Sequence, residues 1–109
     1  MATTYKVLGQ ANPSATTATT LYTVPSATQA VVSTIVICNQ TSSAATFRIS
    51  VRPAGASQTA AMYIAYDVTV GASDSTALTL GITLGATDVI TVYGSTATLS
   101  FTAFGSEIA

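Results

Sequence analysis

The stretch TFRISVRPAG, residues 46–55, alternates apolar and polar side chains and then meets a proline. Successive side chains of a β-strand point to opposite faces, so Phe47, Ile49 and Val51 are expected to face a core while the residues between them face outward. Pro53 lacks the N–H that a strand ladder needs and ends the run. The stretch predicts a half-buried strand with two arginines on its outer side.

The same pattern recurs along the chain. Runs of β-branched and aromatic residues are separated by Gly, Pro, Asn, Asp and Ser, and no segment shows a helical period with caps. Eight strands are expected, at 4–9, 18–24, 29–38, 45–52, 62–70, 75–84, 88–94 and 98–104. Short strands without intervening helices are typical of a sandwich. The expected fold is all-β, a single antiparallel β-sandwich, jelly-roll-like, of about eight strands.

Two of these runs make specific predictions about burial. The run 75–84 places four apolar side chains on one side, which predicts a half-buried strand: Leu78, Leu80, Ile82 and Leu84. The run 29–38 is apolar on both sides, with one side carrying Val31, Ile35 and Ile37 and the other Val32, Val36 and Cys38. Such a strand lies either in the centre of the sandwich or with its outer face buried between subunits.

Length and composition limit the function classes. A chain of 109 residues is expected to form one domain over 1–109, with residues 1–20 as a partly extended N-terminal arm. Charged residues make up 6% of the chain, against about 25% in ordinary soluble proteins. With a net charge of -1, no electrostatic attraction to nucleic acid or to anionic lipid is expected. No signal peptide or membrane span is predicted, so synthesis in a cytoplasm is expected.

The residues that most enzymes need are scarce. Histidine is absent, so the commonest general base and metal ligand are missing, and the single Cys38 supports neither a thiol protease nor a zinc site. The chain has no phosphate-binding glycine motif. The remaining option is a carboxylate pair, drawn from Asp67, Asp74, Asp88 and Glu107. Two of these lie in turn contexts and Glu107 in an expected tail, so no enzyme, no cofactor and no metal site are predicted.

Only three cationic side chains exist, and their scarcity makes them candidates for an interface. Arg48 and Arg52 share the outer side of one strand, which is either a solvated face or a docking face. Asp67, in the middle of the run 62–70, or an acidic neighbouring subunit would be the natural mate of an arginine. The candidate interface residues are Arg48, Arg52, Asp67 and Lys6.

Five tyrosines offer a possible stacking platform for sugars or bases: Tyr5, Tyr22, Tyr63, Tyr66 and Tyr93. Tyr63 and Tyr66 are three residues apart, so strict alternation puts them on opposite faces of a strand and prevents them from serving one platform. A role as edge and core filler with a hydrated hydroxyl is the alternative.

Sheet edges lead to an expectation about assembly. Exposed edges are usually blunted by Lys, Pro or inward charges, and Lys6 is the only lysine here. The edges therefore need to be covered, either by packing into a closed ring of subunits, such as a trimer, or by packing onto a larger surface, and a homo-oligomer is expected.

The chain resembles small β-sandwich proteins encoded among the virion genes of tailed bacteriophages, cyanophages included. The stretches that carry the resemblance are YKVLGQ, LYTVPSATQAVVSTIVICNQ, FRISVRPAG, LGITLGATDVITVY and LSFTAFG. The resemblance implies a structural virion component and assigns no functional residues to this chain. Its expected partners are sister subunits and the major capsid protein or another virion protein.

Two places on a virion suit such a module. A capsid decoration (cement) protein sits on the exterior of the shell, over junctions between capsomers, and this is the expected function and location. The alternative is a tail, baseplate or fibre module that contacts host-surface glycan. The chain contains no stalk, which favours the decoration protein.

Overall fold

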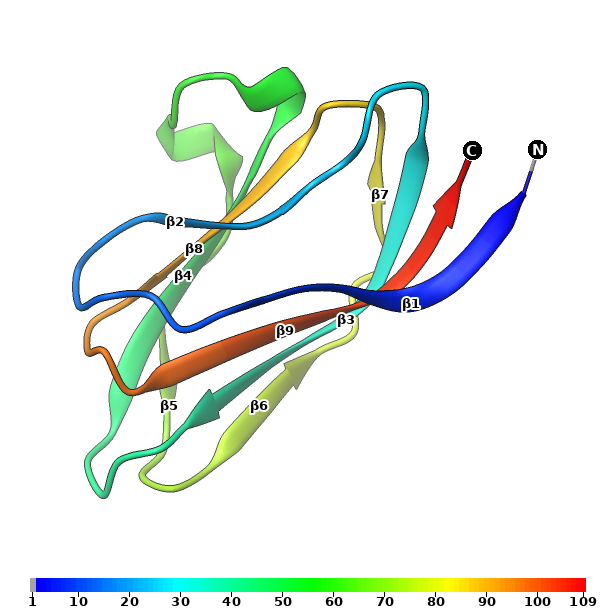
Figure 1. The fold of residues 1–109 in the computed structure, drawn as a ribbon. Helices are drawn as coiled ribbons and strands as arrows, with labels where there is room; N and C mark the ends of the chain where they lie inside the picture. Colours follow the sequence, from blue (N-terminus) through cyan, green and yellow to red (C-terminus); the bar gives the residue numbers. More distant parts are fainter. Residues whose placement is uncertain (1) are drawn as a thin grey trace.

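In a computed structural model that describes residues 2–109, the chain forms two antiparallel sheets packed face to face (Figure 1). Sheet A has the strand order β1-β9-β3-β6, with β7 also paired to β3, and sheet B has the order β2-β8-β4-β5. The strands are β1 (Thr3–Ala11), β2 (Thr19–Thr23), β3 (Gln29–Asn39), β4 (Ala45–Arg52), β5 (Tyr63–Val70), β6 (Ser75–Leu78), β7 (Ile82–Leu84), β8 (Val89–Gly94) and β9 (Leu99–Ile108). Two short 3-10 turns, η1 (Pro53–Gly55) and η2 (Ala60–Met62), lie between β4 and β5.

The pairing of the strands is nested. The outermost pair along the chain is β1 with β9, followed inward by β2 with β8, β3 with β6, and β4 with β5, all antiparallel. The pairs alternate between sheet A and sheet B, which is the arrangement of a jelly roll, with β7 as an added short strand. The predicted all-β sandwich is confirmed.

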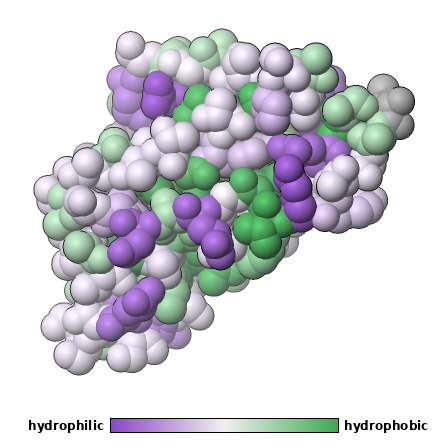
Figure 2. Space-filling view, viewed as in Figure 1, coloured by the Kyte–Doolittle hydropathy of each residue, from purple (hydrophilic) through white to green (hydrophobic). Residues whose placement is uncertain are grey.

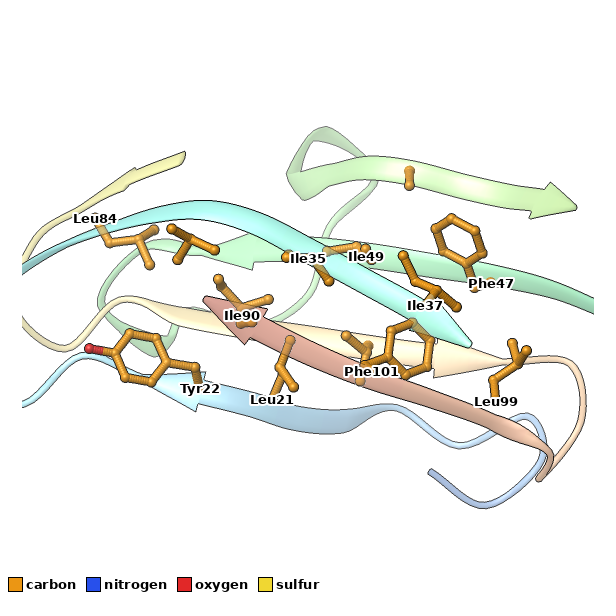
Figure 3. Packing of buried hydrophobic residues seen from close by; sticks show 14 of the residues in the cluster. Leu21, Tyr22, Ile35, Ile37, Phe47, Ile49, Leu84, Ile90, Leu99 and Phe101 are labelled. Atoms are coloured by element: carbon orange, nitrogen blue, oxygen red, sulfur yellow. The ribbon is translucent and has the colours of Figure 1, made fainter. Parts of the chain in front are cut away.

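The core lies between the sheets and is built by the inward side of each strand (Figure 3). Phe47 from sheet B meets Phe101 from sheet A edge to face, with ring centroids 6.2 Å apart. Ile35, Ile37 and Ile49 are fully buried around them. Alternating apolar residues form strands here because each places one side chain in two in this dry layer, where burying apolar surface supplies most of the folding free energy.

The central strand β3 departs from strict alternation. It lies between β9 on one side and β6 and β7 on the other, so of the two alternatives for this run the structure shows a central strand. Its register with β9 shifts between Val32 and Thr34, a bulge at Ser33. Val32 is therefore buried together with Ile35, while Val31 is only half-buried on the outer side. The predicted grouping of Val31 with Ile35 is wrong because one extra residue reverses the faces.

The expected strand over 75–84 is two strands. Gly81 adopts a φ of +64°, a left-handed conformation that interrupts the run. As a result β6 pairs with residues 35–38 of β3, and β7 pairs with residues 30–32. Leu80 lies in the break and is 53% exposed, so its predicted place in the core is wrong. Leu84 is buried as predicted.

Both ends of the described chain belong to sheet A. Residues 3–11 form β1 along β9 of the same molecule and are not a free arm. Glu107, expected in a tail, lies within β9. Ala2 and Ala109 exchange two backbone hydrogen bonds, of 2.8 and 3.0 Å. Ala2 and Ala109 therefore lie side by side, where the adjacent strands β1 and β9 begin and end (Figure 1).

Candidate functional site

A cluster of tyrosines surrounds Arg48 on the outer face of sheet B. Arg48 projects from β4, between the two flanking strands β8 and β5. Its guanidinium carbon lies 4.2 Å from the ring centroid of Tyr66 on β5 and 4.4 Å from that of Tyr93 on β8. Both distances are within the range of cation–π attraction. The middle strand thus holds one aromatic ring on each side of its arginine.

Asp67 fixes the arginine in place. The Arg48 Nε donates to Asp67 Oδ1 at 2.7 Å, and Nη2 reaches Oδ2 at 3.4 Å. The hydrogen bond to Asp67 raises the pKa of the guanidinium above its ordinary value. Of the two mates that the sequence suggested for an arginine, Asp67 and an acidic neighbouring subunit, Arg48 has Asp67 of the same molecule. The charges of Arg48 and Asp67 therefore neutralise each other.

The position of Asp67 depends on bulges that alternation does not reveal. The register between β4 and β5 shifts twice, so that Ser50 pairs with Tyr63, Ile49 with Ala65, and Phe47 with Val68. Asp67 takes up the second bulge with a φ of 52°. Asp tolerates this left-handed conformation better than most residues.

The bulge between Tyr63 and Ala65 brings Tyr63 and Tyr66 to the same face. Their ring centroids are 4.9 Å apart with the planes at 80°, an edge-to-face contact. The prediction that the two rings point to opposite faces is wrong, because one extra residue between Tyr63 and Ala65 resets the alternation between them. Tyr66 is 56% exposed, so the contact lies at the surface.

An open hollow of about 480 Å³ adjoins this pair of rings. It is lined by Gln58, Thr59, Ala60, Tyr63 and Tyr66. Gln58 fixes the side of the hollow that is formed by the loop before β5. Its Oε1 accepts a hydrogen bond from the Ser50 hydroxyl at 2.6 Å, and its Nε2 donates one to the Thr59 carbonyl at 2.9 Å. The hollow therefore combines two aromatic walls with polar neutral groups.

Arg52 forms hydrogen bonds with the loop that follows β4, away from the Arg48 cluster. Its Nε donates to the Ala56 carbonyl at 2.7 Å and its Nη2 to the Gly55 carbonyl at 3.0 Å. A third contact, of 3.3 Å, reaches the Thr91 hydroxyl. Two of the three hydrogen bonds of Arg52 thus go to the turn that follows β4, and the third goes to β8. The two arginines, expected to share either a solvated or a docking face, have different surroundings.

Lys6 lies on the other sheet. Its Nζ is 2.8 Å from Glu107 Oε1, and Glu107 Oε2 accepts a 2.5 Å hydrogen bond from the hydroxyl of buried Tyr22. Hydrogen bonds from Lys6 and Tyr22 lower the pKa of Glu107. Burial, followed by the bond to Glu107, raises the pKa of Tyr22. Lys6, Arg48 and Arg52 therefore lie in three separate places, so the predicted interface residues do not form one site.

The outer face of sheet A carries an apolar patch that the sequence reasoning missed. Tyr5 is 84% exposed, and Val7 pairs in register with Phe104, also exposed. Tyr5, Val31 and Phe104 border one open hollow of about 500 Å³. Figure 2 shows hydrophobic side chains gathered on the visible face, over the region where β1, β9 and β3 lie side by side. These four residues, Tyr5, Val7, Val31 and Phe104, are called the sheet A patch.

A signal for this patch was present in the sequence. Tyr5 and Val7 alternate with Lys6 and mark one apolar side of β1. Their exposure was not predictable, because the same pattern is typical of a strand that faces the core.

The remaining carboxylates have structural partners. Asp88 accepts from the backbone N–H groups of Ala54 and Gly85, both at 2.8 Å, and Asp74 accepts from that of Ser75 at 2.8 Å. Among residues 2–109 no group of three or more metal-ligating side chains comes together. Within the same range, no helix has the length and apolar character needed to cross a membrane.

Comparison of the chain with protein-family models, with curated proteins and with solved structures finds no match.

Proposed function

We propose that this protein is a structural component of a tailed-phage virion, a decoration protein that binds the capsid exterior over capsomer junctions. The observation that carries the proposal is the sheet A patch, an exposed apolar surface on a chain with 6% charged residues. Contiguous exposed apolar surface in a soluble protein marks a contact with another molecule. The jelly-roll order adds support by analogy alone, since viral capsid domains use it among many other proteins.

The ion pair beside this patch is already neutralised, which favours a neutral partner surface. Lys6 borders the patch and is already paired with Glu107, so the patch presents no free ion among the described residues that line it. A shell protein with an apolar surface at its capsomer junctions would bury the rings of Tyr5 and Phe104 without leaving a buried unpaired charge.

The mechanism is additive and passive. Each copy buries its patch against the shell, and a homotrimer would place three such contacts on one junction. Linked contacts bind far more tightly than a single one because the second and third form at a high effective concentration. Many copies together would then oppose separation of the capsomers.

A capsid-binding experiment tests the proposal. Val7→Ser combined with Phe104→Ser should abolish cosedimentation with undecorated capsids assembled from the phage shell protein. The matched control is Ile64→Ser combined with Val68→Ser, two exposed apolar residues on β5 of the other sheet, and it should bind like the parent. Equal binding by the patch variant and the parent would refute the proposal. Light scattering on the parent protein measures its mass in solution and tests whether it is a trimer.

A second candidate function is a tail, baseplate or fibre module that contacts host-surface glycan. The contact of Tyr63 with Tyr66 beside an open hollow favours it. Immunogold labelling or a virion reconstruction separates the two, because the first requires the protein on the head and the second on the tail.

A further inference from the structure

We infer that the hollow beside Tyr63 and Tyr66 is a binding site for a neutral saccharide. This site goes beyond the shell-binding role and supplies a ligand class for the second candidate function. It lies on the outer face of sheet B, whereas the sheet A patch lies on the other sheet. Shell binding and saccharide binding can therefore be tested separately.

The first argument is rigidity. Arg48 contacts the rings of Tyr66 and Tyr93 and is itself held by two hydrogen bonds to Asp67. Tyr63 then packs its ring against Tyr66. Side chains fixed in this way lose little conformational entropy when a ligand arrives, which improves affinity for a weakly interacting ligand.

The second argument is shape. A hollow of about 480 Å³ lies within the range of small-molecule sites. The two rings meet at 80° and form a corner. One ring can stack on the C–H face of a pyranose while the other borders its edge. A proline-rich peptide is less suited, because it lies across roughly parallel aromatic ridges and not within a corner.

The third argument is charge. Arg48 and Asp67 neutralise each other, and the residues that line the hollow carry no charge. A phosphate or a sialic acid would find no unpaired cation there, and nucleic acid binding would need several. The polar groups that remain are tyrosine hydroxyls, the Thr59 side chain and the Gln58 amide. Such groups match the hydroxyls of a neutral sugar.

The test is a titration of isotopically labelled protein followed by NMR. The probes are the methyl glycosides of glucose, galactose, mannose and N-acetylglucosamine, their common disaccharides, sialyllactose, and a proline-rich peptide. At least one neutral saccharide should shift the signals of residues 58–66. Its affinity should change little between about 0.05 and 0.5 M salt, because no ion pair forms.

Variants locate the site. Tyr63→Ala leaves the contacts of Arg48 in place and should weaken binding about tenfold, as expected for the loss of one stacked ring. Tyr66→Phe keeps the ring and should retain most of the affinity. Tyr5→Ala, on the other sheet, should bind like the parent. A folded spectrum for each variant is the control for structure.

Three results would overturn the inference: no shift at 58–66 with any neutral saccharide, unchanged affinity in Tyr63→Ala, or stronger binding of the peptide or of sialyllactose than of every neutral sugar. None of these results bears on the capsid-binding experiment, which depends on Val7 and Phe104.

Discussion

The hydroxyl of Tyr22 donates a 2.5 Å hydrogen bond to the carboxylate of Glu107 and so ties β2 of one sheet to β9 of the other. Tyr22 is 7% exposed, and Lys6 holds the second oxygen of the same carboxylate. One ionised group therefore connects three strands at the side of the sandwich.

This connection predicts a dependence of stability on pH. The folded protein lowers the pKa of Glu107 below its ordinary value of 4.5, so the stabilisation is present above that pH and is lost as the pH falls through the lowered value. The raised pKa of Tyr22 gives stabilisation below its ordinary value of 10.0 that is lost as the pH rises through the folded value. Chemical unfolding across the pH range measures both effects.

Tyr22→Phe should flatten the alkaline loss and lower the free energy of unfolding near neutral pH by about 1–3 kcal/mol, the range for a hydrogen bond to a charged group. Tyr5→Phe is the matched control, since Tyr5 is 84% exposed. Equal stability of the two variants would contradict the prediction.

Gly105 is expected to tolerate no side chain. A Cβ there would lie 2.0 Å from the Val31 carbonyl oxygen and 3.0 Å from Leu8 Cδ1, so backbone would have to move. We expect Gly105→Ala to cost about 3 kcal/mol in thermal or chemical unfolding. For Gly85→Ala the nearest atom is 3.8 Å away, and the change should stay within about 0.5 kcal/mol. A stable Gly105→Ala protein would show that β9 and β3 can separate at this point.

Two phenylalanines on β9 should behave differently. Phe101 is fully buried against Phe47, and Phe101→Ala should lower the free energy of unfolding by about 3–5 kcal/mol. Phe104 is 39% exposed in the sheet A patch, and Phe104→Ala should cost about 1 kcal/mol or less. Urea unfolding measures both. A large loss in Phe104→Ala would mean that the patch serves the fold of the single chain.

The two arginines should also differ. Arg52→Ala removes two hydrogen bonds to loop carbonyls, so amide hydrogen exchange in 53–60 should become about tenfold faster. Arg48→Ala should leave that loop unchanged and increase the mobility of Tyr66 and Tyr93. Equal exchange in the two variants would contradict the assignment of Arg52 to the loop.

The alternation of apolar and polar residues located the strands but did not identify the buried face of every strand. It works in β4, where Phe47 and Ile49 are buried as expected. It fails wherever one residue is inserted without a sequence signal, as at Ser33 and around Asp67. At Gly81 the signal was present, since glycine readily adopts positive φ, but glycine also occurs inside continuous strands.

The candidate site shows the same limit. Scarcity singled out Arg48 and Arg52 and left Asp67 and an acidic neighbouring subunit open as mates, and the structure pairs Arg48 with Asp67. The contact of Tyr63 with Tyr66 depends on the bulge between Tyr63 and Ala65, which is set by how β5 fits the twist of β4. The sheet A patch depends on which face of β1 turns inward. That choice is made by the packing of the whole sandwich, so local sequence does not determine it.

The hydrogen bonds between Ala2 and Ala109 have a practical consequence for engineering. A linker of a few residues could join the two ends into a circular backbone without disturbing either sheet. The domain could likewise be spliced into an exposed loop of a carrier protein, entering and leaving at one point. Any peptide fused to either end would emerge from the same pole of the molecule.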